Sequence, residues 1–165
     1  MTDEAMAVPR ETAAAARRRD LAGPVPAGAW RTEVPVRFSH CDPAGIVYFA
    51  RYFDMLNGVV EDWFSEALGI DYHDMIGRRR TGLGFASAGA EFLSPGFMGD
   101  RLTCAVTVER IGRSSLTFRI HASRGDEPVF AARLVMVTTS LDTHRSIPLP
   151  DDLRAALERY WESCK

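Results

Sequence analysis

The chain has 165 residues, of which 46% are hydrophobic and 25% are charged, and its formal net charge is −2 at pH 7. This length suits a single domain with a sizeable core, and the composition excludes a chain that is disordered throughout. A charge so close to zero gives no global attraction to nucleic acid or to an anionic membrane, so neither is expected as a partner.

Residues 1–28 differ in composition from the rest of the chain. They contain an alanine run, an arginine triplet at 17–19 and a stretch rich in glycine and proline, but few large apolar residues. Such a segment can bury little surface, and we expect a mobile tail, or a short helix that forms only on a partner. The tail would precede a single folded domain over residues 29–165.

The folded domain is expected to open with a strand. Residues 30–38 alternate between apolar and polar side chains, which is the period of a half-buried strand with Phe38 on its apolar face. Pro35 lacks a backbone N–H, so this strand should lie at an edge of its sheet or donate hydrogen bonds on one side only.

A long helix is predicted next. Between residues 46 and 68, aromatic and aliphatic side chains recur at steps of three and four residues. Gly45 and the β-branched pair after it disfavour an earlier start, so the helix should begin near Tyr48, and Gly69 is a suitable stop. Gly58 lies in mid-helix, where glycine costs about 1 kcal/mol relative to alanine, and we expect another backbone to pack closely there.

The remainder of the chain predicts an antiparallel meander and a final helix. The strand patterns cover residues 83–93, 102–109, 116–120 and 129–137. The last of these strands is apolar on both faces, which indicates an interior position in the sheet. A short helix should follow the Pro-Leu-Pro sequence at 148–150, with Asp151 or Asp152 as its cap. A sheet curled around the long helix would bury both apolar faces, which predicts an α+β fold.

The cysteines and the hydropathy of the chain exclude several classes of protein. Cys41, Cys104 and Cys164 are widely separated and form no C-x-x-C pair. A disulfide framework or a thiolate zinc site is therefore not expected, and no metal is predicted. No apolar run reaches the ~20 residues that cross a bilayer, and the N-terminus lacks the apolar core of a signal peptide. We therefore expect a cytoplasmic protein.

Asp42 admits two interpretations. Aspartate followed by proline is typical of a helix start, so Asp42 could simply cap the long helix. A helix that starts later, near Tyr48, would instead place Asp42 on a loop in front of unpaired backbone N–H groups. Thioester hydrolysis needs such an arrangement, because donors must stabilise the charge that develops on the carbonyl oxygen while a carboxylate attacks the carbon or activates water.

Three stretches of the sequence are informative when they are taken in order. Residues 36–49 read VRFSHCDPAGIVYF, residues 91–100 read EFLSPGFMGD, and residues 112–116 read GRSSL. The first carries an Asp-Pro-Ala-Gly motif, the second a proline turn before Gly-Asp, and the third a turn into the next strand. Over residues 32–142 the chain resembles the 4-hydroxybenzoyl-CoA thioesterase family of the hotdog-fold superfamily.

The resemblance implies a fold, an activity and an assembly. The fold would be a hotdog, in which about five antiparallel strands wrap one long helix and a short C-terminal helix follows. The activity would be hydrolysis of an acyl-CoA thioester, with coenzyme A as part of the substrate rather than a cofactor. The acyl group would be aromatic, such as 4-hydroxybenzoyl. Homodimers would pair into tetramers, with each site lying between subunits.

The resemblance also implies roles for particular residues. Asp42 would be the catalytic carboxylate, as nucleophile or as general base, and the backbone amide of Phe49 would be the oxyanion donor. The residues expected to contact the substrate are Tyr48, Arg113, Ser114 and Ser115, the last three near the nucleotide of coenzyme A. Relatives carry more basic residues at this turn, and they often have an acidic residue in place of His40, whose role stays open.

Other interpretations remain open from the residues. In a non-catalytic acyl-CoA-binding module Asp42 would only cap the helix, and a hotdog hydratase or dehydratase would need His40 as its acid–base partner. Acyl carrier protein could replace coenzyme A as the carrier. Glu61 is a reserve catalytic carboxylate, although an ion pair explains it more simply. The arginines at 78–80 could hold the phosphates of a neighbouring subunit's nucleotide or lie in a solvated loop.

Overall fold

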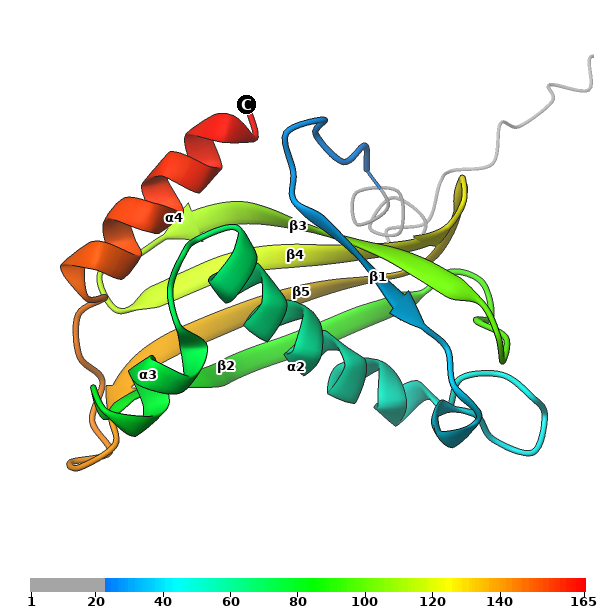
Figure 1. Ribbon diagram of the computed structural model, residues 1–165, viewed down its shortest axis with the longest axis horizontal. Helices are drawn as coiled ribbons and strands as arrows, with labels where there is room; N and C mark the ends of the chain where they lie inside the picture. The colour runs from blue at the N-terminus through cyan, green and yellow to red at the C-terminus, as the bar shows by residue number, and fades with distance from the viewer. Residues whose placement is uncertain (1–22) are drawn as a thin grey trace, which may run out of the picture.

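The computed structural model describes residues 23–165, so most of the predicted N-terminal tail lies outside the described residues. The strands are β1 (Arg31–Pro35), β2 (Thr81–Phe92), β3 (Arg101–Ile111), β4 (Ser115–Arg124) and β5 (Glu127–Ser140). The helices are α2 (Phe49–Glu66), α3 (Tyr72–Gly77) and α4 (Asp151–Ser163), and a 3-10 turn, η1, covers Phe38–His40. The strands form one antiparallel sheet in the order β1-β3-β4-β5-β2, and α2 crosses its concave face (Figure 1). The predicted fold class is therefore confirmed.

The core lies between α2 and the sheet. The apolar stripe of α2 buries Trp63 and Phe64 completely, and the Trp63 ring lies 5.4 Å from the ring of Phe118 on β4. Each large apolar side chain that is fully buried stabilises the fold by about 1.5–3 kcal/mol. From α4, Tyr160 also reaches Trp63, with ring centroids 5.3 Å apart, and its hydroxyl donates a hydrogen bond to a carbonyl of β3. The stripe thus fixes α2 lengthwise against the sheet.

The strand positions follow the sequence patterns. β1 is an edge strand that pairs only with β3, where Pro35 faces Arg101, so the missing N–H of Pro35 disrupts no interior ladder. β5 lies between β4 and β2, as its two apolar faces predicted. β2 forms the opposite edge of the sheet, and its residues from Gly84 to Gly89 are exposed.

Several local expectations are wrong. Phe38 is 82% exposed, because the chain leaves the strand at Pro35 and turns into η1 before the alternation can continue. A Cβ placed on Gly58 would meet no atom within 4 Å, so no backbone packs closely there. α4 begins after Pro150 without a side-chain cap, and the two aspartates that were expected to cap it occupy its first turn instead. None of the described helices is long and apolar enough to cross a membrane.

Candidate active site at the start of α2

The chain between η1 and α2 forms a small hairpin over residues 40–48. The backbone N–H of Asp42 donates to the carbonyl of Ile46 at 3.0 Å, and that of Tyr48 donates to the carbonyl of His40 at 3.0 Å. The tip is a turn closed by the N–H of Gly45, which donates to the carbonyl of Asp42 at 2.9 Å. Gly45 has φ +78°, a left-handed conformation that glycine adopts without steric cost. This hairpin keeps Asp42 apart from the helix.

The carboxylate of Asp42 belongs to this turn rather than to α2. One of its oxygens, Oδ1, accepts a hydrogen bond from the backbone N–H of Ala44 at 2.8 Å. The N-cap of α2 is Tyr48, six positions later, so the interpretation of Asp42 as the helix cap is wrong. Within residues 23–165, no hydrogen bond or ion pair engages Oδ2 of the half-buried Asp42. The second oxygen is therefore available for chemistry.

α2 begins without the groups that usually neutralise a helix start. Tyr48 makes no side-chain cap, and the first turn contains no acidic residue. By contrast, Asp71 caps α3 by accepting from the N–H of Asp74 at 2.9 Å. Among the described residues, none accepts a hydrogen bond from the backbone N–H of Phe49. The N-terminal field of α2 and its free donors are thus left for an outside acceptor, and they favour negative charge there.

The loop between β2 and β3 supports the hairpin from the side. The carbonyl of Gly96 accepts from the N–H of Val47 at 2.9 Å, and the N–H of Met98 donates to the carbonyl of Gly45 at 3.2 Å. Gly96 also donates its own N–H to the hydroxyl of Tyr52 at 3.2 Å. The predicted proline turn at 91–100 is therefore the element that holds the Asp42 hairpin against α2.

A groove of about 330 Å³ opens beside the start of α2. It is lined by Ile46, Val47, Phe49, Tyr52, Phe92, Leu93, Ser94 and Pro95. Burial raises the pKa of Tyr52, so its hydroxyl keeps its proton at neutral pH. Most of the large apolar side chains that are exposed gather around the same region: Phe38, Tyr48, Phe49, Phe92, Phe97 and Met98. Phe85 does not line this groove, and its ring centroid lies 6.4 Å from that of Phe118.

The turn predicted to contact the nucleotide lies at the other end of the sheet. The start of β3 pairs with the end of β1, next to the hairpin, whereas Arg113 and Ser114 follow the end of β3. β3 has 11 residues, so the two regions of one chain are separated by roughly 35 Å, at about 3.3 Å per residue. Arg154 of α4 fixes the turn by donating to the carbonyls of Gly112 and Arg113 at 2.6 and 3.3 Å. One chain does not bring Asp42 and this turn together.

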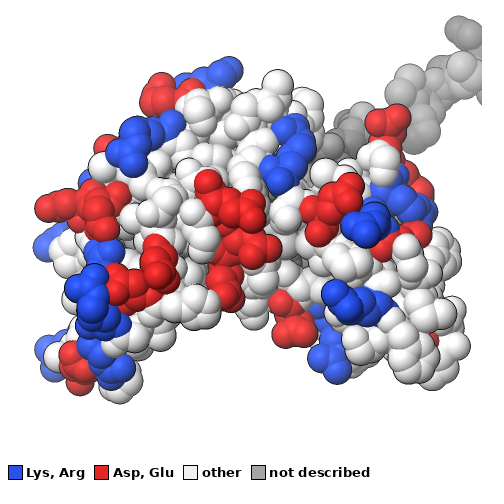
Figure 2. Space-filling model, in the orientation of Figure 1, with Lys and Arg blue, Asp and Glu red and all other residues white. Residues whose placement is uncertain are grey.

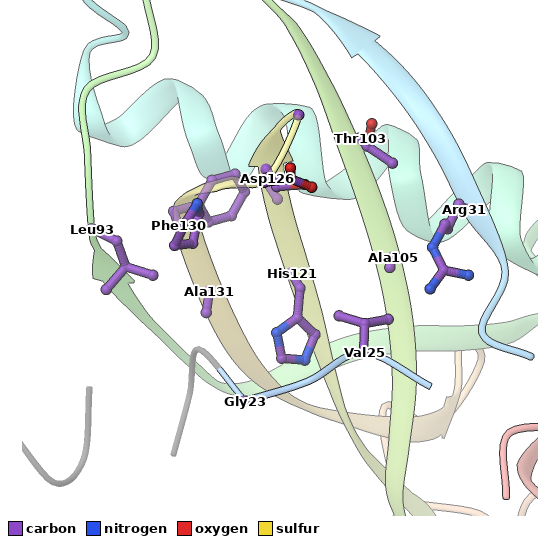
Figure 3. Close-up of a pocket in the computed structure, with 14 residues that line it drawn as sticks. Gly23, Val25, Arg31, Leu93, Thr103, Ala105, His121, Asp126, Phe130 and Ala131 are labelled. Carbon is purple, nitrogen blue, oxygen red and sulfur yellow. The ribbon is translucent and has the colours of Figure 1, made fainter. Parts of the chain in front are cut away.

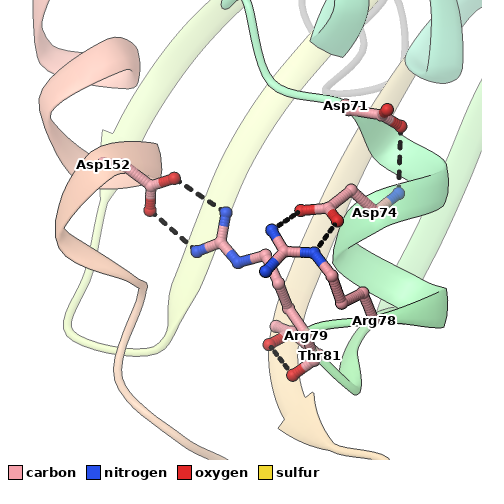
Figure 4. A network of polar contacts seen from close by, with 6 residues as sticks. All are labelled: Asp71, Asp74, Arg78, Arg79, Thr81 and Asp152. Carbon is pink, nitrogen blue, oxygen red and sulfur yellow. Dashed lines mark hydrogen bonds and ion pairs between the residues drawn. The ribbon is translucent and has the colours of Figure 1, made fainter.

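The other candidate residues have partners within the chain. Arg78 pairs with Asp74, Arg79 with Asp152 and Arg80 with Asp142, with shortest distances of 2.5, 2.7 and 3.0 Å, and Figure 4 shows the first two pairs. The Arg79 pair joins the end of α3 to α4, so this triplet fastens elements of one chain. Glu61 pairs with His73 at 2.9 Å, so a contact within the chain accounts for its side chain.

Two further surface features lie away from the hairpin. Figure 2 shows acidic side chains gathered over the middle of the face that carries α2, whose outward residues include Asp54, Asp62 and Glu66. A phosphate would be repelled there.

A hollow of about 290 Å³ lies between residues 23–25 and the sheet face turned away from α2, with His121 among its lining residues (Figure 3). None of residues 40–48 lines it.

The chain matches known thioesterases over most of its length. The model of the Thioesterase-like superfamily matches residues 36–157. A 1,4-dihydroxy-2-naphthoyl-CoA hydrolase of Thermosynechococcus vestitus is 30% identical over 125 residues, which cover 74% of this chain and 84% of that protein. A crystal structure of a thioesterase superfamily protein from Jannaschia sp. CCS1 is 28% identical, with a TM-score of 0.77 over 83% of this chain and 96% of the other.

A further solved structure agrees in fold. The 1,4-dihydroxy-2-naphthoyl-CoA thioesterase from Synechocystis has a TM-score of 0.71 over 78% of this chain and 95% of its own, at 23% identity. The predicted class, a thioester hydrolase with the hotdog fold, is confirmed, and the predicted family resemblance is confirmed at the level of the superfamily. Those curated relatives are named for a naphthoyl rather than a 4-hydroxybenzoyl thioester. The chain belongs to the Thioesterase-like superfamily.

Proposed function

We propose that the protein hydrolyses an aromatic acyl-CoA thioester at the start of α2, with Asp42 as the catalytic carboxylate. The observation that carries the proposal is the juxtaposition of three features: a carboxylate oxygen without a described partner, a helix start without a cap, and an apolar groove beside both. Each supplies one requirement of acyl transfer, namely a nucleophile or base, an oxyanion donor and an acyl pocket.

The chemistry assigns one role to each group. The thioester carbonyl oxygen accepts a hydrogen bond from the backbone N–H of Phe49, which stabilises the negative charge of the tetrahedral intermediate. Oδ2 of Asp42 either attacks the carbonyl carbon, forming an anhydride that water then cleaves, or removes a proton from the attacking water. In both routes the C–S bond breaks, coenzyme A leaves as a thiolate, and the oxygen of water ends in the free acid.

The groove favours an aromatic acyl group. Phe49, Tyr52 and Phe92 line it, and aromatic rings prefer offset or edge-on contacts with other rings. Its volume of about 330 Å³ lies near the lower end of the ~300–1,000 Å³ range of ligand sites, which suits the acyl group alone. The names of the curated relatives favour a hydroxylated fused ring such as 1,4-dihydroxy-2-naphthoyl. The smaller 4-hydroxybenzoyl group is the second candidate.

We further propose that the complete site needs two chains. The turn at 112–115, expected to bind the nucleotide, lies roughly 35 Å from the hairpin of its own chain by strand length, so it could serve only the hairpin of another chain. β2 offers the edge for such an assembly, because residues 81–90 carry no charge and most of them are exposed. A long, uncharged edge strand readily pairs with a second copy. The dimers would then associate into tetramers.

A panel of thioesters tests the proposed activity. Thiol release would be measured from 1,4-dihydroxy-2-naphthoyl-CoA, 4-hydroxybenzoyl-CoA, benzoyl-CoA and hexanoyl-CoA, with wild type and Asp42→Asn side by side. We expect turnover by wild type to favour the hydroxyaryl esters and to be lost in the variant. Tight binding of the esters by both proteins without turnover would instead establish the acyl-CoA-binding module.

A further inference from the structure

We infer that His40 is a positioning residue, whose neutral imidazole holds the Asp42 hairpin in place and makes hydrolysis sensitive to acid. The inference rests on the proposed function of Asp42 and adds a residue and a pH dependence to it. His40 ends η1, two residues before Asp42, and it is half-buried. It contacts the chain on both sides of the hairpin.

His40 makes one hydrogen bond through its ring and two through its backbone. Nδ1 of the ring accepts from the backbone N–H of Arg37 at 3.0 Å, and the backbone N–H of His40 donates to the carbonyl of Arg37 at 3.0 Å. The carbonyl of His40 accepts from the N–H of Tyr48 at 3.0 Å. Tyr48 immediately precedes Phe49, the proposed oxyanion donor. One residue therefore ties the start of the hairpin to the segment that follows β1, and its end to the N-cap of α2.

The ring contact is compatible with only one form of the imidazole. A backbone N–H can only donate, so Nδ1 must carry a lone pair, and the neutral ring carries its proton on Nε2. Protonation would place a second N–H on Nδ1, facing the N–H of Arg37, and the bond would be lost. Histidine ordinarily changes charge between pH 5 and 8. Acid should therefore loosen η1 and displace Asp42 from the start of α2.

Charged groups of both signs share a groove with the ring. A groove of about 300 Å³ between β1 and α2 contains His40 together with Glu33 and Arg37 from the first strand and turn, and Asp54 and Asp62 from α2. The other neighbours that can titrate are Asp42 itself and Cys41, whose thiol points toward the carbonyl of Arg37 at 3.5 Å. The hydrogen bond that Nδ1 accepts from the Arg37 N–H is the contact that an asparagine can test.

The hydratase alternative gives His40 a different role. In that reaction the imidazole would exchange a proton with the substrate, so any substitution that cannot titrate would abolish turnover. A positioning role predicts instead that His40→Asn keeps its turnover. The asparagine Oδ1 lies one bond beyond Cγ, as Nδ1 does in histidine, and it can accept from the Arg37 N–H at every pH.

The decisive experiment compares the pH dependence of kcat/KM for wild type, His40→Asn and His40→Ala on the best ester of the panel. We expect wild type to lose activity as pH falls from 8 to 5. His40→Asn should retain kcat/KM within a few-fold of wild type at pH 8. As pH falls, its kcat/KM should begin to drop only at a lower pH than that of wild type. His40→Ala should lose about tenfold or more at all pH values, because small displacements of catalytic groups are costly. His73→Asn, on α3, is the matched control and should leave the profile unchanged.

A second readout does not depend on turnover. Protection factors of the Arg37 and Tyr48 amides, which remove the intrinsic pH dependence of hydrogen exchange, should fall in acid for wild type and stay constant in His40→Asn. If wild type hydrolyses no ester but shows this exchange pattern, the proposed function fails and the positioning role of His40 stands. Equal exchange and parallel pH profiles in wild type and His40→Asn would overturn the inference.

Discussion

The carboxylate of Asp42 accepts a hydrogen bond from the backbone N–H of Ala44 at 2.8 Å, within the same four-residue turn that Gly45 closes. The catalytic candidate therefore has two functions that a substitution can separate. Oδ1 stabilises the turn, and Oδ2 is left for the proposed reaction. An amide can replace the first oxygen but not the second, because its nitrogen neither attacks a carbonyl nor accepts a proton.

Asp42→Asn and Asp42→Ala should consequently differ in stability but not in activity. Both should lower kcat by ~10²-fold or more, the usual worth of a positioned acid–base group. The asparagine variant keeps an acceptor for the Ala44 N–H, whereas the alanine variant should lose about 1 kcal/mol of the free energy of unfolding. Thiol-release assays and urea titrations would measure the two effects. Activity of Asp42→Asn within a few-fold of wild type would sink the assignment.

Two glycines should respond in opposite directions to substitution by alanine. Gly45 has φ +78°, so Gly45→Ala forces an L residue into the left-handed region at a cost of about 1–2 kcal/mol and should shift Asp42. Gly58 is helical and exposed, and a Cβ added to it would meet no atom within 4 Å, so Gly58→Ala should stabilise α2 by about 0.5–1 kcal/mol. Thermal melts of both variants check the signs. A destabilised Gly58→Ala protein would contradict the second expectation.

The fold could be predicted from the sequence because the hydrophobic patterns of its helix and strands are long enough to be recognised. The stripe of α2 and the alternation in the strands extend over many residues, and burying both apolar faces leaves one arrangement. α3 was missed, because six residues are too few to display a helical period. The hairpin at 40–48 could not be predicted either. Its conformation depends on Gly96 and Met98, about 50 residues away, and no local pattern encodes those hydrogen bonds.

Gly96 and Tyr52 should be energetically coupled. A Cβ on Gly96 would lie 2.8 Å from the Tyr52 hydroxyl oxygen, so Gly96→Ala must displace the ring or the loop that supports the hairpin. In a Tyr52→Phe background the hydroxyl is absent, and the same substitution should cost less. A double-mutant cycle on the free energy of unfolding should give a coupling of about 0.5 kcal/mol or more. If the effects of the two substitutions on the free energy of unfolding were strictly additive, the loop would accommodate the added Cβ without any involvement of the Tyr52 ring.

Asp100 should make the supporting loop sensitive to strong acid. Burial raises the pKa of Asp100, but the hydrogen bond from the Phe97 N–H at 2.8 Å and the Arg124 guanidinium at 2.6 Å together lower it below the ordinary value. A lowered pKa in the folded state contributes stability above the unfolded value of about 3.9, and this is lost as pH falls through the folded value. Unfolding free energies of wild type and Asp100→Asn should therefore converge in strong acid, once pH falls below the lowered pKa of Asp100 in the folded state. If the difference in unfolding free energy between the two proteins grew as pH fell, the expected direction of the Asp100 pKa shift would be contradicted.

Ala88→Lys tests whether the free edge of β2 is an assembly surface. Ala88 is exposed in the single chain, so the lysine should leave the fold intact, whereas a second copy paired along this edge would meet an unwanted charge. We expect wild type to sediment as a dimer or tetramer, and Ala88→Lys to sediment as a folded monomer without thioesterase activity, because Asp42 and the turn at 112–115 no longer meet. Ala155→Lys, on the exposed face of α4, is the control for added charge. A monomeric Ala88→Lys protein with full activity would show that one chain suffices, and the nucleotide would then have to bind near the hairpin of its own chain.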